Sequence, residues 1–175
     1  MKDTRAMISV LLTSVGTDSA VALCEALRDA FPRELQLVGV DTRAAVACLP
    51  WLDQFSRVPP RNSPDFMDHV LGLCRSHEIT HVWPLSTEDQ SIMALESTSR
   101  LADRVVLVSP ADVVAIANDK IRLYDYCAAG GLPLPAYRVV HDVPSLVRAA
   151  HELGYPGKPA GSRPPWERAP PVSRS

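Results

Sequence analysis

The stretch MISVLLTSVGTD, from Met7 to Asp18, decides the fold of this chain. Its first half, Met7 to Leu12, is a short apolar run without alternation, which is typical of a parallel strand covered on both faces. Thr17 and Asp18 then supply side chains that can cap a helix. Apolar residues follow at helical spacing: Ala20, Leu23, Cys24, Leu27 and Phe31. The stretch therefore predicts a strand that leads directly into a helix.

The same alternation of strand and helix continues along the chain. Three further strands are predicted, at Leu35 to Val40, His81 to Leu85 and Arg104 to Val108. We interpret Thr42 to Pro60 as an irregular connection. Because parallel strands need crossover connections, the pattern predicts the α/β class, with a Rossmann-like parallel sheet and helices on both faces.

Capping residues mark the starts of the intervening helices. Ser63-Pro64 and Ser109-Pro110 each place a cap residue before a proline that suits the first turn. Ser86, followed by Thr87, Glu88 and Asp89, starts another helix with carboxylates in its first turn, where the helix dipole favours them.

The character of the sequence changes at Asn118. Asn118 or Asp119 can cap a helix that Gly130-Gly131 ends, and Ala136 to Val140 is predicted to be a strand. Asp142 opens a last helix. We divide the chain into residues 1–115, 116–160 and 161–175, and expect the Pro- and Arg-rich last segment to be disordered.

Composition excludes several classes of partner. The 175 residues suffice for one domain, or for one domain and part of another, and the net charge of −2 does not suggest a nucleic-acid or membrane partner. No apolar run approaches the roughly 20 residues of a membrane helix. Lys2 and Arg5 precede an apolar run as in a signal peptide, but we interpret the run as a buried strand. Four widely spaced cysteines argue against a zinc site or disulfides and favour the cytoplasm.

Polar residues follow two of the predicted strands. Thr13, Ser14 and Gly16 follow the first strand, and Ser86, Glu88 and Asp89 follow the third. The carboxyl ends of parallel strands meet at one edge of the sheet, where open α/β sheets bind ligands. These residues could therefore hold a small polar substrate. The alternative is that both groups only cap their helices.

The sequence contains two other candidate sites. Dinucleotide binding is disfavoured, because the loop after the first strand has one glycine where the fingerprint needs three, although Asp41 ends the second strand where a ribose-binding acid would lie. Lys120 begins a helix, a position that is unfavourable for a cation unless a phosphate binds there; a solvated lysine is the alternative. The five histidines show no metal-ligand spacing.

The order of several motifs resembles the ATP-grasp ligases, a superfamily that includes biotin carboxylases and carbamoyl-phosphate-synthase-like proteins. The resemblance spans roughly residues 7 to 163. It rests on Val38 to Asp41, Trp83 to Ser86 with Glu88, Ser109-Pro110, Asn118-Asp119-Lys120, Tyr124, Gly130 to Pro135 and Gly154-Tyr155-Pro156. It implies that residues 1–115 form a pre-ATP-grasp domain and that residues 116–160 begin the ATP-grasp domain.

The resemblance also implies a function. Lys120 and Lys158 would contact ATP, although only Gly157 separates Pro156 from Lys158, where the family has several strand residues. The complete parent would use ATP and Mg²⁺ to activate a small carboxylate or amino-acid-like substrate as an acyl phosphate and pass it to an amine. The rest of the phosphate loop and the metal ligands do not follow Arg163.

We therefore expect a fragment that is inactive alone, with no catalytic residue, metal or cofactor assigned to it. The change of composition after Arg163 suggests a deletion, a frameshift or an early stop. A homodimer, or a separate chain that supplies the C-terminal half, is left open as the partner. A non-enzymatic module that binds a small metabolite is the alternative function, and an NAD-dependent oxidoreductase is the least favoured.

Overall fold

The computed structural model describes residues 7–157, which form two compact units divided between Asn118 and Asp119. Each unit is described by itself. Lys158 and the segment 161–175, for which an ATP contact and disorder are predicted, lie outside the described residues. No helix within residues 7–157 has the length and apolar character that crossing a membrane requires.

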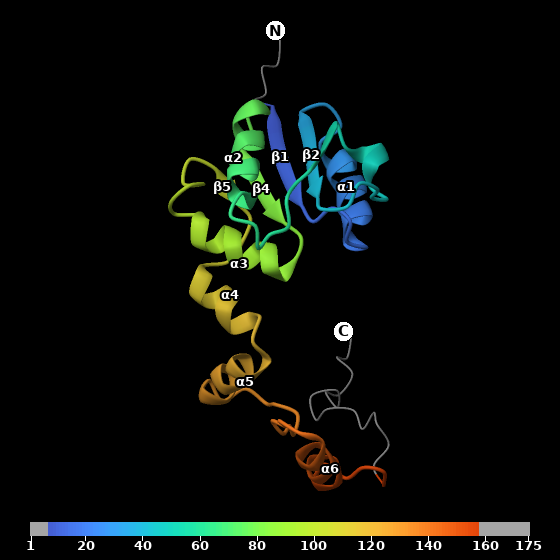
Figure 1. The fold of residues 1–175 in the computed structure, drawn as a ribbon, viewed down its shortest axis with the longest axis vertical. Coiled ribbons are helices and arrows are strands. Elements are labelled where there is room, and N and C mark those ends of the chain that lie inside the picture. Colours follow the sequence, from blue (N-terminus) through green and yellow to red (C-terminus); the bar gives the residue numbers. More distant parts are fainter. Residues whose placement is uncertain (1–6, 158–175) are drawn as a thin grey trace, which may run out of the picture. The chain divides into compact units, whose positions relative to one another are not determined.

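The first unit is built on a five-stranded sheet in which all neighbouring strands are parallel (Figure 1). Its strands are β1 (Ile8–Thr13), β2 (Leu35–Asp41), β3 (Gln54–Arg57), β4 (His81–Pro84) and β5 (Val105–Val106), in the order β3-β2-β1-β4-β5. The central strand β1 pairs with β2 up to Thr13↔Val40 and with β4 up to Thr13↔Pro84. Both pairings end at Thr13, so the carboxyl ends of β1, β2 and β4 lie side by side there.

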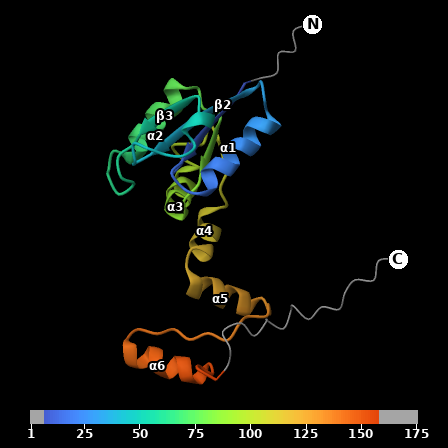
Figure 2. The same cartoon turned by 90° about the vertical axis from the view of Figure 1, so that its right-hand side faces the viewer.

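Helices cover both faces of this sheet, as the α/β prediction requires (Figure 2). These helices are α1 (Ser19–Ala30) on one face and α2 (Phe66–Ser76) and α3 (Thr87–Glu96) on the other. A short 3-10 helix, Leu49–Trp51, lies beside α1, and α4 (Ala111–Ala117) lies against α3. The strand β1 sends Val10 and Leu12 into the core beneath α1, and Leu11 into the core beneath α2 and α3. Burial on both faces explains why its sequence is continuously apolar.

Some element boundaries differ from the prediction. The strand β3 lies within the stretch that we interpreted as irregular, and β5 is limited to two residues. Ser86 caps α3 as predicted, because its Oγ accepts a hydrogen bond from the Asp89 amide. The helix α2 begins later than predicted, with Asp65 as its N-cap, and Pro110 takes the cap position of α4.

The buried cysteines behave as apolar side chains. Cys24 and Cys74 lie in the two cores, where burial raises the pKa of each thiol to about 11. Cys48 is buried as well, and Cys127 is half-buried. Cys24 and Cys74 thus pack as small hydrophobic residues.

The second unit contains α5 (Lys120–Ala129) and α6 (Val143–Glu152). Asp119 caps α5 by accepting hydrogen bonds from the amides of Ile121 (2.9 Å) and Arg122 (3.1 Å). Gly130 follows the helix, and Gly131 has a φ of 69° that suits glycine. The predicted helix, with its cap at Asp119 and its end at Gly130-Gly131, is therefore confirmed.

The strand predicted at Ala136 to Val140 is wrong. This segment has no assigned secondary structure, and the strands within residues 7–157 all lie in the first unit. A strand is defined by backbone hydrogen bonds to a neighbour, and β-branched composition alone does not supply one. Side chains hold the segment instead: the Tyr137 ring lies edge-on to Tyr124 at 4.7 Å, and Arg138 pairs with Glu152 at 2.7 Å.

Candidate functional site

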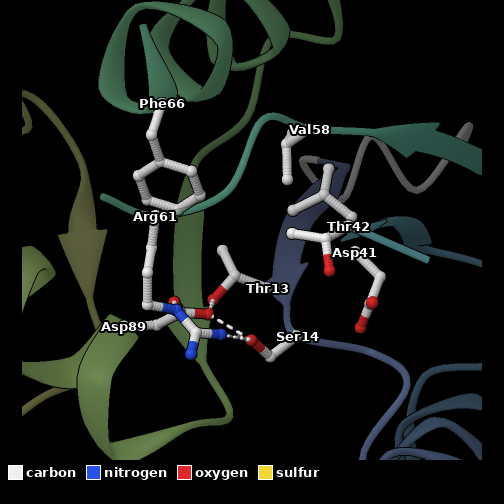
Figure 3. A pocket seen from close by; sticks show the side chains of 9 residues that line it. Thr13, Ser14, Asp41, Thr42, Val58, Arg61, Phe66 and Asp89 are labelled. Carbon is white, nitrogen blue, oxygen red and sulfur yellow. Dashed lines mark hydrogen bonds and ion pairs between the residues drawn. The ribbon is translucent and has the colours of Figure 1, made fainter. Parts of the chain in front are cut away.

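The candidate site lies where the direction of chain connections in the sheet reverses. The connection from β1 leads to β2 on one side, and that from β4 leads to β5 on the other. Such a reversal leaves a crevice at the carboxyl ends of the strands. A small pocket that is open to solvent lies near it, at the carboxyl ends of β1 and β2 (Figure 3). Its lining residues are Thr13, Ser14, Val40, Asp41, Thr42, Val58, Arg61, Phe66 and Asp89.

Asp89 is the central charged group of the cavity wall. Its side chain is only 2% exposed. Its Oδ2 accepts hydrogen bonds from Thr13 Oγ1 (2.7 Å) and Ser14 Oγ (2.5 Å), and its Oδ1 accepts one from Arg61 Nε (3.0 Å). Ser86 fixes the start of α3 and so the position of Asp89. These partners offset the cost of burying a carboxylate, which is large when the charge is unpaired.

Arg61 closes one side of the cavity from the loop between β3 and α2. Its Nη2 donates to Ser14 Oγ at 3.1 Å, and its Nη1 lies 3.5 Å from Glu88 Oε2. Figure 3 shows its side chain extending past the Phe66 ring to the Asp89 carboxylate. The Glu88 backbone amide and the nearby Arg61 guanidinium hold the pKa of Glu88 below its usual value. Glu88 is therefore ionised at neutral pH.

Asp41 holds the loop between β1 and α1 at the other end of the cavity. Its Oδ2 accepts a hydrogen bond from the Gly16 amide (2.7 Å), and its Oδ1 accepts from the Arg43 amide (2.9 Å) and Nε (3.2 Å). Burial raises the pKa of Asp41, but these hydrogen bonds and the Arg43 charge outweigh it, and the pKa lies below its usual value. Asp41 therefore stabilises the conformation of the loop between β1 and α1.

Most of the predicted substrate residues meet at this edge of the sheet. Thr13 and Ser14 line the cavity, Ser86 Oγ lies 3.3 Å from Ser14 Oγ, and Glu88 reaches the same cluster through Arg61. Gly16 faces Asp41 through its amide and does not line the cavity. That these five residues bind substrate stays a prediction.

Arg61 and Phe66 are among the lining residues that the sequence did not predict for the site. Arg61 follows two prolines in a segment without periodicity, where nothing marks one arginine as turned inward. Phe66 is the first residue of α2, and its apolar character predicts burial without distinguishing a cavity wall from the core. A search for cations near the predicted acids along the chain would not have found Arg61, because Glu88 lies 27 positions after it.

Lys120 belongs to the second unit and lines a pocket there that is open to solvent. The other lining residues are Ile121, Tyr124, Tyr137, Arg138 and Val139. Lys120 is the first residue of α5 and is exposed. Two cations beside tyrosine rings could accept a phosphate and a flat ring, but the ATP contact stays a prediction. Within residues 7–157, no three His, Cys, Asp or Glu side chains are grouped so that they could hold a metal ion.

Sequence comparison yields no relative: no family model and no curated protein matches the chain. Solved structures do match. The biotin carboxylase domain of a single-chain bacterial carboxylase is 18% identical, with a TM-score of 0.56 over 85% of this chain and 35% of its own. An ADP complex of N5-carboxyaminoimidazole ribonucleotide synthetase is 14% identical, with a TM-score of 0.61 over 87% of this chain and 38% of its own.

A third match is the biotin carboxylase domain dimer of 2-oxoglutarate carboxylase from Hydrogenobacter thermophilus, in complex with MgADP, ADP and bicarbonate. It is 16% identical, with a TM-score of 0.56 over 87% of this chain and 34% of its own. The present chain thus spans about a third of the length of these structures. In fold, the chain corresponds to the N-terminal part of these ATP-grasp enzymes, and the predicted resemblance is confirmed at that level.

Proposed function

We propose that this chain is the N-terminal part of an ATP-grasp ligase that joins a carboxylate to an amine through an acyl phosphate, and that it is inactive alone. The observation that carries the proposal is the extent of the structural likeness. It covers 85% of the 175 residues, which is more than the 118 residues of the first unit. The likeness therefore continues into the helices of the second unit, as it would in a ligase that continues into an ATP-grasp domain.

The two units would have different tasks in the complete enzyme. The first would hold a small substrate in the cavity between Thr13, Ser14 and Asp89, with Ser86 and Glu88 at its rim. The second would present Lys120 to the ATP phosphates, because a phosphate at the start of α5 meets both the lysine and the helix dipole. Since matched structures carry ADP, MgADP and bicarbonate, ATP and Mg²⁺ are the cofactors proposed for the complete enzyme.

The parts that are not in this chain would supply the remaining phosphate contacts and the metal ligands. Phosphoryl transfer depends almost entirely on positioning and charge neutralisation, so a third of such an enzyme would not turn over. One matched domain is a dimer, so a second copy, or a separate C-terminal half, is the partner that we propose.

A calorimetric titration of the chain with Mg-ATP tests the role of Lys120. We expect a dissociation constant no tighter than about 1 mM, equivalent to roughly −4 kcal/mol, because most phosphate contacts lie elsewhere. Lys120→Ala should abolish the remaining binding, since it removes a cation from the start of α5.

Arg148→Ala is the matched control, because it removes one exposed cation from α6, outside the cavity. Micromolar affinity for Mg-ATP would contradict the proposal that this chain lacks most of the nucleotide site. Binding that persists in Lys120→Ala, or that Arg148→Ala lowers equally, would contradict the role of Lys120.

A binding module that acts without ATP is the second candidate. It is favoured by one observation: all nine lining residues of the sheet-edge cavity belong to the first unit, so the site does not depend on the second. Affinity for a small metabolite that is unchanged by Mg-ATP and is lost in Ser14→Ala or Glu88→Gln would favour this candidate over the ligase.

A further inference from the structure

Two of the cysteines lie in contact in one core of the first unit. Cys24 belongs to α1, Cys48 is the residue before the 3-10 helix, and both are fully buried in the core beneath α1. Their side chains are hydrogen-bonded to each other. Cys48 Sγ also donates a hydrogen bond to the backbone oxygen of Val15 at 3.2 Å. The proposed function uses neither thiol, and two thiols in contact are the reactants from which a disulfide forms.

A third buried cysteine provides an internal comparison. Cys74 lies in the core on the opposite face of the sheet and is as completely buried as Cys24. Burial raises the pKa of each of these two thiols to about 11. They are therefore matched in burial and acidity, whereas Cys24 has a second thiol beside it and Cys74 has charged side chains. A difference in their oxidation would report the neighbouring thiol.

The loop that precedes Cys48 gives an oxidant a route to this thiol. Residues 42–47 contain no helix or strand, and most of them are exposed. Exposed segments of this kind open locally at a lower free energy than a packed core. Opening of the loop would reach Cys48 before Cys24, which is held in α1. Burial raises the pKa of Cys48, but the hydrogen bond from Cys24 opposes that rise and so favours the reactive thiolate.

We propose that Cys24 and Cys48 form a reversible redox switch, in which a peroxide oxidises them to a disulfide and a low-molecular-weight thiol reduces them again. The Cys48 thiolate attacks the peroxide, so that an S–O bond forms, the O–O bond breaks and hydroxide leaves. The Cys24 sulfur then attacks the Cys48 sulfur, the S–S bond forms, and the oxygen leaves as water with the Cys24 proton. The two thiols lose two electrons and two protons in total, and one hydrogen peroxide becomes two waters. Reduction returns both protons by thiol–disulfide exchange.

Oxidation would act on the loop that carries Ser14 at the candidate site. The disulfide leaves Cys48 Sγ without a hydrogen, so the Val15 oxygen loses this donor. Val15 is 1% exposed, so water does not readily replace the lost bond. The next residue is Gly16, whose amide binds Asp41. The disulfide should therefore loosen the loop between β1 and α1, and this inference does not depend on the proposed ligase activity.

Peroxide treatment of the complete chain, followed by alkylation of the remaining thiols under denaturing conditions and tryptic mass spectrometry, tests the proposal. We expect a linked pair of peptides, residues 6–28 with Cys24 and residues 44–57 with Cys48, which dithiothreitol separates. Cys74 should remain alkylated to the same extent as in the untreated chain. Oxidation of Cys74 before the linked pair forms would overturn the proposal. Links to Cys74 or Cys127 that are as frequent would show random exchange and would also overturn it.

Two variants test the order of the steps. In Cys24→Ala, peroxide should leave a sulfenic acid at Cys48 that dimedone captures. Cys74→Ala is the matched control and should form the disulfide as the unsubstituted chain does; an equal loss of the link in both variants would overturn the role of Cys24.

Amide hydrogen exchange of the unsubstituted chain measures the effect on the loop without any substitution. The Gly16 amide should exchange about tenfold faster in the oxidised than in the reduced chain, a factor that corresponds to the loss of one hydrogen bond. An unchanged rate at Gly16, in a chain whose disulfide has formed, would overturn the effect on the candidate site.

Discussion

The two units use amphipathic helices in opposite ways. In the first unit, α2 buries Phe66, Met67, Val70 and Cys74 against the sheet. In the second unit, α6 has an equally regular apolar face, yet Val143, Leu146 and Val147 are 71%, 53% and 50% exposed. Apolar spacing thus predicts both helices, whereas it does not predict whether the apolar face is buried within the described residues.

We therefore expect the first unit to contribute most of the free energy of unfolding. Burial of apolar surface contributes about 25 cal/mol per Å², and the two cores on either side of the sheet collect most of the buried apolar side chains among residues 7–157. Isolated helices shorter than about 12 residues are marginal in water. Both helices of the second unit have 10 residues, so their contribution to cooperative unfolding should be small.

The largest difference between the units is expected from truncating a leucine in each. Leu11→Ala should lower the free energy of unfolding by about 3 kcal/mol, because Leu11 is fully buried in the central strand and its loss leaves a cavity. Leu146→Ala should change it by less than about 0.5 kcal/mol, because Leu146 is exposed and alanine favours the helix. Urea denaturation followed by circular dichroism measures both. Equal losses would mean that α6 belongs to the same cooperative unit as the sheet.

The same contrast explains how far the sequence could predict the structure. Val10 to Leu12 were identifiable as a strand because burial on both faces leaves a continuous apolar run. The edge strand Gln54–Arg57 was missed because it is short and none of its residues is buried. Val139 and Val140 suggested a strand by composition, but no neighbouring strand pairs with them in the described part of the chain.

The candidate site divides in a similar way. Thr13, Ser14 and Ser86 were predictable because the ends of parallel strands must meet at one edge of the sheet. Arg61 was not, because its position depends on the course of an irregular loop. Hydrophobic periodicity predicts helices and strands from the sequence. A single contact made by a loop depends on three-dimensional packing, which periodicity does not predict.

A smaller difference is expected from removing a carboxylate in each unit. Asp41→Asn should lower the stability of the first unit by about 2 kcal/mol at pH 7, because Asp41 is 6% exposed and accepts charge-assisted hydrogen bonds from Gly16 and Arg43. Asp142→Asn should leave the unfolding of the sheet unchanged, because Asp142 is exposed and caps α6. Urea midpoints measured by circular dichroism provide the comparison, and an equal loss in Asp142→Asn would contradict it.

The pH dependence of unfolding gives an independent measure of how much Asp41 stabilises the first unit. Its pKa in the folded chain lies below the ordinary value of 3.8, so its contribution to stability is fully present above that value. The contribution is lost as the pH falls through the folded pKa. Unfolding free energies measured from pH 7 to pH 3 should therefore fall less steeply below pH 4 in Asp41→Asn than in the unsubstituted chain. If the unfolding free energies of the two proteins fell equally steeply below pH 4, Asp41 would not stabilise the loop.

The smallest expected difference concerns the two capped helices. Ser86→Ala should lower the stability of the first unit by about 1 kcal/mol. Ser86 Oγ accepts a hydrogen bond from the Asp89 amide at 3.1 Å and so caps the helix α3. Asp142→Ala removes the corresponding bond at α6, from the Ser145 amide, and should reduce helix content without moving the main unfolding transition. Amide hydrogen exchange resolves the two helices separately, because locally unfolding segments exchange independently of the core. If α6 amides in the unsubstituted chain were as protected as those of α3, the second unit would be part of the cooperative core, and the difference in burial between α2 and α6 would not reflect their stability.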